Sequence, residues 1–349
     1  MKVAISFFGV CATRSAELGR WQGLLNSIHS EGSQLVSVNS SELDLFIAVD
    51  HSETHLRSVS TRIPKNCRFL VLREGPSIRP DQFRRRVLIR YGRVFLATSQ
   101  PKLLTAQPFG DPVLSIPYQD GFIKSEIPRK KGSTRKNHSV CMVNQNKFSL
   151  HSASNYHLRQ SVLKEISRCE LDITVAGRDW DIGTGDYFFN QFKSAIFLTS
   201  KLTGFRLRSL RIPLSRATKE RISFEGYITD LESFLERFEF NLIIENDNMR
   251  VTEKLFSALA CGCIPIYFGP NLDDFGIPRQ IYVRLDHPRD ILSTIERIKN
   301  MSNLEISDMR HSGERWFHSF QTQERWSEEL SMRRLWSVIK DEYCRIERQ

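Results

Sequence analysis

The sequence lacks the patterns that most quickly place a chain in a functional class. None of its seven cysteines belongs to a C-x-x-C pair, and its nine histidines form no H-E-x-x-H. This spacing argues against a disulfide framework or a zinc site, and it predicts reduced thiols. No run approaches the roughly 18 apolar residues that a membrane span needs. We therefore expect a cytoplasmic protein without a metal site.

The chain does have enough apolar material to build real cores. At 349 residues, 40% of them hydrophobic, it has about the right size for two ordinary domains. Its charge is high but mixed, which argues against wholesale disorder. The net charge of +10 favours an anionic partner, namely a phosphate-bearing substrate, a membrane surface or a nucleic acid. Charge alone does not choose among these three.

Apolar runs of strand length alternate with helical patterns along most of the chain. Continuous apolar strands separated by helices indicate parallel sheets covered by helices on their faces. The first run, at residues 1–8, predicts a strand rather than a targeting segment. We expect further strands at 43–49, 68–72, 94–97, 139–143, 171–175, 240–245 and 264–268, and helices at 52–60, 155–167, 231–238 and 252–260.

A basic stretch without an apolar face, residues 124–138, divides the chain. We interpret it as a linker between an acceptor-side domain, 1–123, and a donor domain, 139–310; a surface loop within one domain is the alternative. Residues 181–223 match neither pattern and suggest an insertion. A helical tail, 311–349, ends the chain. Two α/β domains in tandem are typical of the GT-B fold, in which two Rossmann-like domains have parallel sheets facing a cleft.

The most informative segment is 241–255. An apolar strand there ends in a carboxylate and an amide, a short polar loop follows, and a helix begins. Ligands of open α/β sheets bind at the carboxyl ends of strands, and a helix N-terminus suits a pyrophosphate. An ordinary crossover with a solvated first turn is the alternative. The candidate donor-binding residues in this segment are Glu245, Asn246, Arg250, Thr252, Glu253 and Lys254.

This segment resembles the donor-site signature of the α-1,3/4-fucosyltransferase family. From Glu245 to Pro270 it reads E-N-x-x-x-R-V-T-E-K-L-F-x-A-L-x-x-G-x-I-P-I-Y-F-G-P, and the likeness continues through 274–278. Residues 72–76 stand where the family has a Glu-Ser-Pro turn, and 116–118 resemble its Pro-Tyr. The loop before Thr252 is shorter than the family's, and Arg250 stands where an aromatic residue is common.

The resemblance implies an inverting transfer of fucose from GDP-fucose to a hydroxyl of a glycan, in α-1,3 linkage, without a cofactor or metal. Such a transfer needs a base for the acceptor and cations for the leaving pyrophosphate. Glu74 is the candidate base, because the family's base lies in its Glu-Ser-Pro turn. The candidate cations are Arg159, Arg178 and Lys254, while Asn246 and Glu253 would hold the donor's sugar or ribose. Each of these residues has a plain surface role as its alternative.

We expect a nucleotide-sugar donor and an oligosaccharide or glycolipid acceptor as partners, as in lipopolysaccharide synthesis, and no nucleic acid. The apolar residues of 314–349 predict amphipathic helices that either return to the first domain or contact a membrane at its surface. Four alternatives stay open. They are a different nucleotide sugar, a GT-A metal site at the D-x-D of 179–181, a glycan-binding protein without activity, and nucleic-acid binding through Arg84–Arg86 and the linker.

Overall fold

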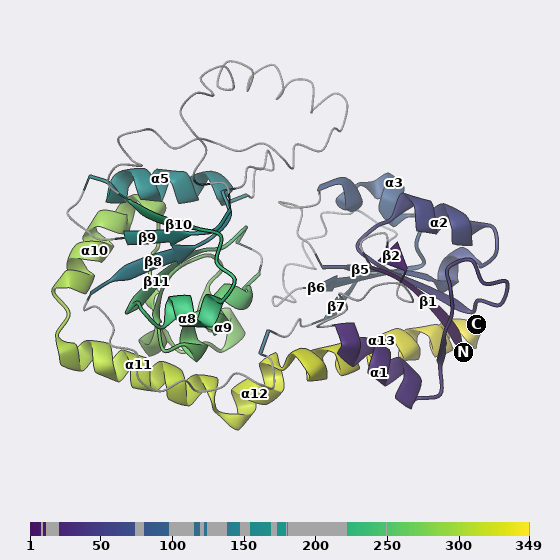
Figure 1. Ribbon diagram of the computed structural model, residues 1–349. Helices are drawn as coiled ribbons and strands as arrows, with labels where there is room; N and C mark the ends of the chain where they lie inside the picture. The colour runs from purple at the N-terminus through teal and green to yellow at the C-terminus, as the bar shows by residue number, and fades with distance from the viewer. Residues whose placement is uncertain are drawn as a thin grey trace, which may run out of the picture. The chain divides into compact units, whose positions relative to one another are not determined.

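A computed structural model describes most of the chain and divides it into two compact units. Unit 1 is Met1–Glu126 with Phe320–Gln349, and unit 2 is Ile127–Ser319. Each unit is a parallel sheet with helices on both faces (Figure 1). The described residues are 1–7, 10–11, 21–73, 80–97, 115–118, 122–123, 138–146, 154–168, 173–178, 180, 222–248 and 250–348.

The sheet of unit 1 has the strand order β2-β1-β4-β5-β6-β7, with β3 beside β1. Its strands pair in parallel except β1 with β2. Residues of β4 and most of β5 are buried, which explains their continuous apolar runs. The strands are β1 Lys2–Phe7, β2 Val10–Cys11, β3 Gln34–Leu35, β4 Leu45–Val49, β5 Arg68–Leu72, β6 Arg93–Ala97 and β7 Ser115–Tyr118.

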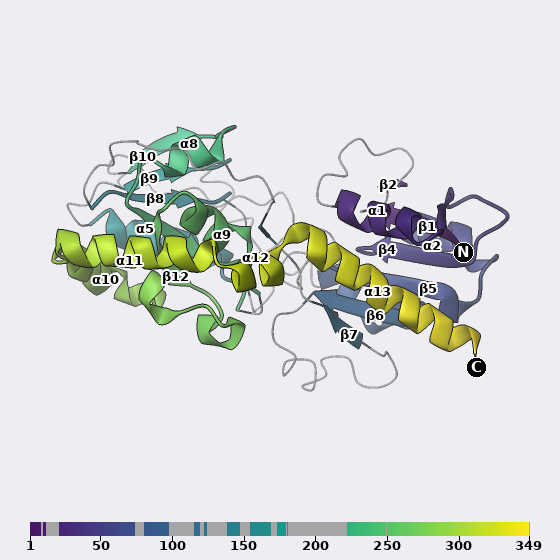
Figure 2. The same ribbon diagram turned by 90° about the horizontal axis from the view of Figure 1, so that it is seen from below.

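Helices α1 and α13 cover one face of this sheet (Figure 2). Helices α2 and α3 contribute to the core on the other face (Figure 1). Ser327 caps the long α13 by accepting a hydrogen bond from the Leu330 amide. The helices of unit 1 are α1 Gln22–Ser30, α2 Glu53–Ser60, α3 Arg85–Leu88, α12 Phe320–Trp326 and α13 Glu328–Glu347, with 3₁₀ turns at Lys65–Cys67 and Pro80–Phe83.

Residues 311–349 do not form a separate unit. Through Ser319 they belong to unit 2, and from Phe320 they belong to unit 1. Trp336 and Ile339 on α13 have no exposed surface, because they lie in the core beneath the sheet of unit 1. Of the two alternatives for the tail, return to the first domain and contact with a membrane, this packing supports the return. None of the described helices is long and apolar enough to cross a membrane.

The sheet of unit 2 has the order β10-β9-β8-β11-β12-β13, and all of its pairings are parallel. The chain builds outward from β8 to β10 and then starts again at β11 on the other side of β8. The order therefore reverses between β8 and β11, and such a switch point is where open α/β sheets bind ligands. The strands are β8 Val140–Val143, β9 Ile173–Ala176, β10 Ser223–Gly226, β11 Phe240–Ile244, β12 Ile264–Phe268 and β13 Val283–Arg284.

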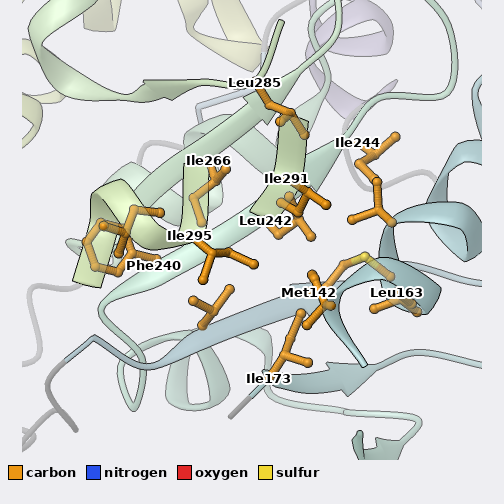
Figure 3. Close-up of a cluster of buried hydrophobic side chains, with 14 of the residues drawn as sticks. Met142, Leu163, Ile173, Phe240, Leu242, Ile244, Ile266, Leu285, Ile291 and Ile295 are labelled. Atoms are coloured by element: carbon orange, nitrogen blue, oxygen red, sulfur yellow. The ribbon is translucent and has the colours of Figure 1, made fainter. Parts of the chain in front are cut away.

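The core of unit 2 fills the space between this sheet and helices α5 and α10 (Figure 3). Met142, Leu242 and Ile266 from three neighbouring strands meet Leu163 of α5 and Ile295 of α10 there. The helices are α5 Tyr156–Ile166, α8 Leu231–Leu235, α9 Glu253–Ala260, α10 Ile291–Lys299 and α11 Asn303–Phe317, with 3₁₀ turns at Leu272–Phe275, Arg279–Ile281 and Pro288–Asp290. This packing fixes the strand ends that carry the candidate residues.

Candidate functional site

The candidate donor residues lie along the carboxyl edge of the sheet of unit 2. Asn144 follows β8 and Glu245 follows β11, on the two sides of the switch point. The Asn144 amide donates to the Ala176 carbonyl at 3.0 Å, and the Glu245 amide donates to the Phe268 carbonyl at 2.9 Å. These bonds continue the sheet one residue past the strands, so this edge is held by backbone pairing.

Arg159 extends from α5 to the end of β11. Its Nη2 donates to the Ile244 carbonyl at 3.0 Å and to Asn246 Oδ1 at 2.7 Å. The guanidinium also lies over the ring of Tyr156, 4.6 Å from its centroid. Arg159, which the sequence suggested only as a cation on a helix, thus binds the end of β11 and the loop that follows it.

The charge of Arg159 is buried, and its described hydrogen bonds are to carbonyl and amide oxygens. Arg159 is 2% exposed; among the described residues, no acidic group forms an ion pair with it and its Nε has no hydrogen-bond partner. Burial lowers the pKa of Arg159 to about 10, although Tyr156 and Glu245 favour the charged form. A buried cation costs free energy unless an anion compensates it. This position therefore favours the binding of an anion.

Glu245 faces inward and organises the loop that follows it. The side chain has no exposed surface; Oε1 accepts from the Thr252 amide at 2.9 Å, and Oε2 accepts from Thr252 Oγ1 at 2.7 Å. Tyr267 donates its hydroxyl to Oε1 at 3.3 Å. Burial raises the pKa of Glu245, while Lys254 and the Thr252 hydrogen bonds oppose that shift. Both oxygens of the Glu245 side chain are thus used by contacts inside the protein.

Gly269, at the end of β12, makes room for this carboxylate. A Cβ at that position would lie 2.7 Å from Glu245 Cγ and 2.9 Å from the Tyr267 hydroxyl oxygen. Such contacts are closer than side chains tolerate, so the glycine of the Gly-Pro pair is needed where Glu245 turns inward.

Lys254 lies in the first turn of α9. Its Nζ donates to Thr252 Oγ1 at 3.0 Å and lies 3.8 Å from Glu245 Oε2 and from Glu253 Oε1. Its side chain is 19% exposed, so the ammonium is held by its neighbours while part of it remains accessible. Glu253 itself is exposed. The N-terminus of α9, which begins after Thr252, thus carries a positioned cation at the carboxyl edge.

The other predicted residues are placed less closely together. Arg178 is exposed, and its guanidinium lies over the ring of Tyr227 at 4.4 Å from the centroid. Arg250 is half-buried in the loop before α9. Contacts between side chains therefore join Arg159 to Asn246, and join Glu245, Thr252 and Lys254 to one another. Glu74 lies outside the described residues.

Asn144 falls near the Ser-Asn position of the fucosyltransferase family, but it was not among the candidate donor-binding residues. It is 4% exposed, and neither atom of its side-chain amide has a partner among the described residues. Gly177 lies against it with a φ of 130°, and a Cβ there would be 1.9 Å from the Asn144 carbonyl oxygen. Gly177, a glycine directly after β9, is the feature of the sequence that permits this close approach. Trp180 also donates to that carbonyl, at 2.6 Å.

The D-x-D pattern gains no support from the described residues. Its two aspartates, Asp179 and Asp181, lie outside them, and Trp180 between them is buried. In the part of the chain that the structure describes, acidic, histidine and cysteine side chains form no group suited to a metal ion.

The carboxyl edge of unit 1 holds the backbone just before Glu74. Asp50 follows β4 with a φ of 55° and is fully buried. Its Oδ1 accepts from the Arg73 amide at 3.1 Å and from Gln82 Nε2 at 2.9 Å. The backbone that leads into the predicted base is therefore fixed by a buried carboxylate.

Comparisons with known proteins support a transferase fold more strongly than a particular family. No family model matches the chain. A curated fucosyltransferase-like protein of Arabidopsis thaliana is 30% identical over 81 residues, which are 22% of this chain and 16% of that protein. The chain thus matches only a small part of that relative's length.

Solved structures match nearly the whole chain. Anabaena HepE in complex with UDP and glucose has a TM-score of 0.56 at 9% identity, covering 98% of this chain and all of that one. A glycosyltransferase from Rickettsia africae has a TM-score of 0.54 at 9% identity, covering 98% of each chain. This protein has the GT-B fold. Sucrose-phosphate synthase from Thermosynechococcus elongatus agrees, with a TM-score of 0.57 at 10% identity over 86% of this GT-B chain and 74% of that one.

Proposed function

We propose that this GT-B protein is a glycosyltransferase that moves a sugar from a nucleoside-diphosphate sugar to a hydroxyl of a glycan. The observation that carries the proposal is Arg159, a buried guanidinium at the switch point of unit 2 that forms no ion pair with any acidic group in the described part of the chain. A diphosphate is the anion that a nucleotide sugar brings to this position. Lys254 adds a second cation at the same edge.

The two cations suit the charge that develops as the diphosphate leaves. Fixed donors stabilise a leaving anion because they need no reorganisation during the reaction. Arg159 is fixed by Asn246 and the Ile244 carbonyl, and Lys254 is fixed by Thr252. Arginine also binds two phosphate oxygens through its planar fork. The described cations therefore fit diphosphate binding without a metal ion.

We propose GDP-fucose as the donor. The resemblance of 245–270 to the fucosyltransferase signature supports it, and so does the short match to the Arabidopsis protein. The HepE structure contains UDP and glucose, so a UDP-sugar is the alternative donor.

The proposed reaction is an inverting displacement. The acceptor hydroxyl oxygen bonds to the anomeric carbon while the bond from that carbon to the diphosphate oxygen breaks. The hydroxyl proton goes to a base, and the nucleoside diphosphate leaves against Arg159 and Lys254. We propose Glu74 as the base, supported by the fixed backbone at Arg73. An oligosaccharide or glycolipid is the proposed acceptor, and an α-1,3 linkage is the proposed product.

A thermal-shift screen across nucleotides and nucleotide sugars tests the proposal. A ligand that binds only the native state raises the melting temperature, so GDP and GDP-fucose should stabilise the protein. Stabilisation by UDP and UDP-glucose alone would replace the donor and keep the activity class. If no nucleotide or nucleotide sugar shifts the melting temperature, the proposed function fails.

A further inference from the structure

An exposed pair, Arg178 and Tyr227, has no role in the function proposed above. Tyr227 is 62% exposed, and Arg178 Cζ lies over its ring at 4.4 Å from the centroid, within the range of a cation–π contact. Single exposed aromatic residues are common on protein surfaces. This one follows β10, and Arg178 follows β9, so both lie at the carboxyl edge where ligands of such sheets bind.

The backbone beneath this pair is fixed although the side chains are exposed. The Gly177 amide donates to the Gly226 carbonyl at 2.7 Å, which joins the ends of β9 and β10. The Arg178 carbonyl accepts from the Asn146 amide at 3.0 Å. Gly226 has a φ of 68°, a left-handed conformation that turns the chain immediately before Tyr227. The backbone that carries Arg178 and Tyr227, which we call the platform, is thus fixed by hydrogen bonds within the protein.

Hydrogen bonds connect this platform with the diphosphate position. Asn146, bonded to Arg178 through the backbone, accepts from Gln160 Nε2 at 2.9 Å. Gln160 is the neighbour of Arg159 on α5. In the sheet, β8 alone separates β9 from β11, so their ends are about 10 Å apart, two strand spacings. A nucleoside diphosphate is an extended molecule that spans such a gap.

We propose that Arg178 and Tyr227 form the subsite for the nucleobase of the donor, a role distinct from the phosphate contact predicted for Arg178. The inference rests on the proposed function, because it assumes that a diphosphate occupies the position of Arg159. A flat base stacks on the exposed aromatic and guanidinium surfaces, and every base has a π-face to offer. A purine offers more area than a pyrimidine, so the platform favours GDP over UDP.

Calorimetric titration of the full chain with GDP, UDP and inorganic pyrophosphate tests the subsite. Stacking on one aromatic side chain is worth enough that Tyr227→Ala should weaken GDP binding about tenfold. The loss should be smaller for UDP and absent for pyrophosphate. Tyr227→Phe keeps the ring and should bind GDP like the wild type. Arg178→Ala should weaken GDP binding less than Tyr227→Ala does.

Phe320→Ala is the matched control, because Phe320 is an aromatic residue in unit 1 that is also exposed, by 76%. It should leave all three affinities unchanged. Wild-type affinity for GDP in Tyr227→Ala would overturn the subsite, as would an equal loss for pyrophosphate. If wild-type protein binds GDP no more tightly than pyrophosphate, the subsite is wrong and the diphosphate site stands. If it binds neither, the proposed function is wrong as well.

Discussion

Arg159 is the residue whose contacts connect the helix α5 with the strand ends. Replacing it with methionine removes a buried charge and the hydrogen bonds to Ile244 and Asn246. Removal of an uncompensated charge offsets much of the lost bonding, so the free energy of unfolding should change little. GDP affinity should fall by tenfold or more, since a charge-assisted phosphate contact is lost. Calorimetry on both proteins measures the two effects separately.

The two measurements can disagree with this account in different ways. A large loss of stability with unchanged nucleotide affinity would make Arg159 a structural residue only. If Arg159→Met loses GDP affinity only to the extent that the protein is unfolded, Arg159 is not a diphosphate-binding residue.

The buried carboxyl group of Glu245 should make the free energy of unfolding depend on pH. Burial raises the pKa of Glu245 in the native state above the ordinary value of 4.5, which we take for the unfolded state. At a pH between the unfolded-state and native-state pKa, the native state therefore binds more protons than the unfolded state. The contribution of Glu245 to stability is therefore present below pH 4.5 and is lost as the pH rises through the higher, native value. Glu245→Gln cannot titrate, so its unfolding free energy should fall less over this window. Denaturant unfolding across the window measures the difference; parallel curves for both proteins would contradict the prediction.

Glu74 is predicted to take up the proton of the acceptor. Glu74→Gln keeps the shape and removes the basicity, so transfer should slow by roughly 10²–10⁴-fold, with donor affinity nearly unchanged. Initial rates and donor titrations separate the two quantities. Near-normal turnover would exclude Glu74 from the mechanism, while lost donor affinity alone would make it a binding residue.

At the scale of elements, the end of β12 supports the end of β11. Gly269→Ala places a methyl group against Glu245 and Tyr267, so the loop held by Glu245 should shift and GDP affinity should fall several-fold. Gly313→Ala, within helix α11, is the control, because its Cβ would lie 3.1 Å from the end of the Leu259 side chain and 3.8 Å from Ile281 Cβ, with no contact closer than 3 Å. Calorimetric titration of both variants compares them. Equal affinities in Gly269→Ala and the wild type would show that the Glu245 carboxylate does not organise the site.

The sequence predicted best those strands whose residues are nearly all buried. Strands β5 and β12 have the predicted bounds, because every residue of β5 after Arg68 and every residue of β12 is buried. Strand β10 was missed, because only alternate residues of Ser223–Gly226 are partly buried and the strand ends in a glycine. A short edge strand of this kind depends on its neighbour β9 for its structure rather than on its own pattern.

The candidate site likewise has a part that the sequence predicts and a part that it does not. Residues 245–254 are contiguous, so their pattern of strand end, loop and helix start is readable from the sequence. The contact of Arg159 with Asn246 joins positions 87 residues apart, and that of Glu245 with Tyr267 joins positions 22 apart. Such pairs follow from the strand order β8-β11-β12, which a single sequence does not specify.

At the scale of the whole molecule, the end of the chain completes the core of unit 1. Trp336 is fully buried with α1 and the sheet, so Trp336→Ala should cost about 3–5 kcal/mol and lower the melting temperature of unit 1. Phe320→Ala, at an exposed position, should stay within about 0.5 kcal/mol of the wild type. Calorimetric melting compares the two. If Trp336→Ala melts normally and instead loses binding to lipid vesicles, the tail serves a membrane rather than the core.

The central claim is that the switch point of unit 2 binds the diphosphate of a nucleotide sugar. Calorimetric titration of the full chain with GDP and with GMP tests this most directly, since the two ligands differ only in the second phosphate. The account predicts saturable binding of GDP, at least tenfold tighter than that of GMP. Equal binding of both nucleotides, or no binding of any nucleoside diphosphate by the folded protein, would contradict it.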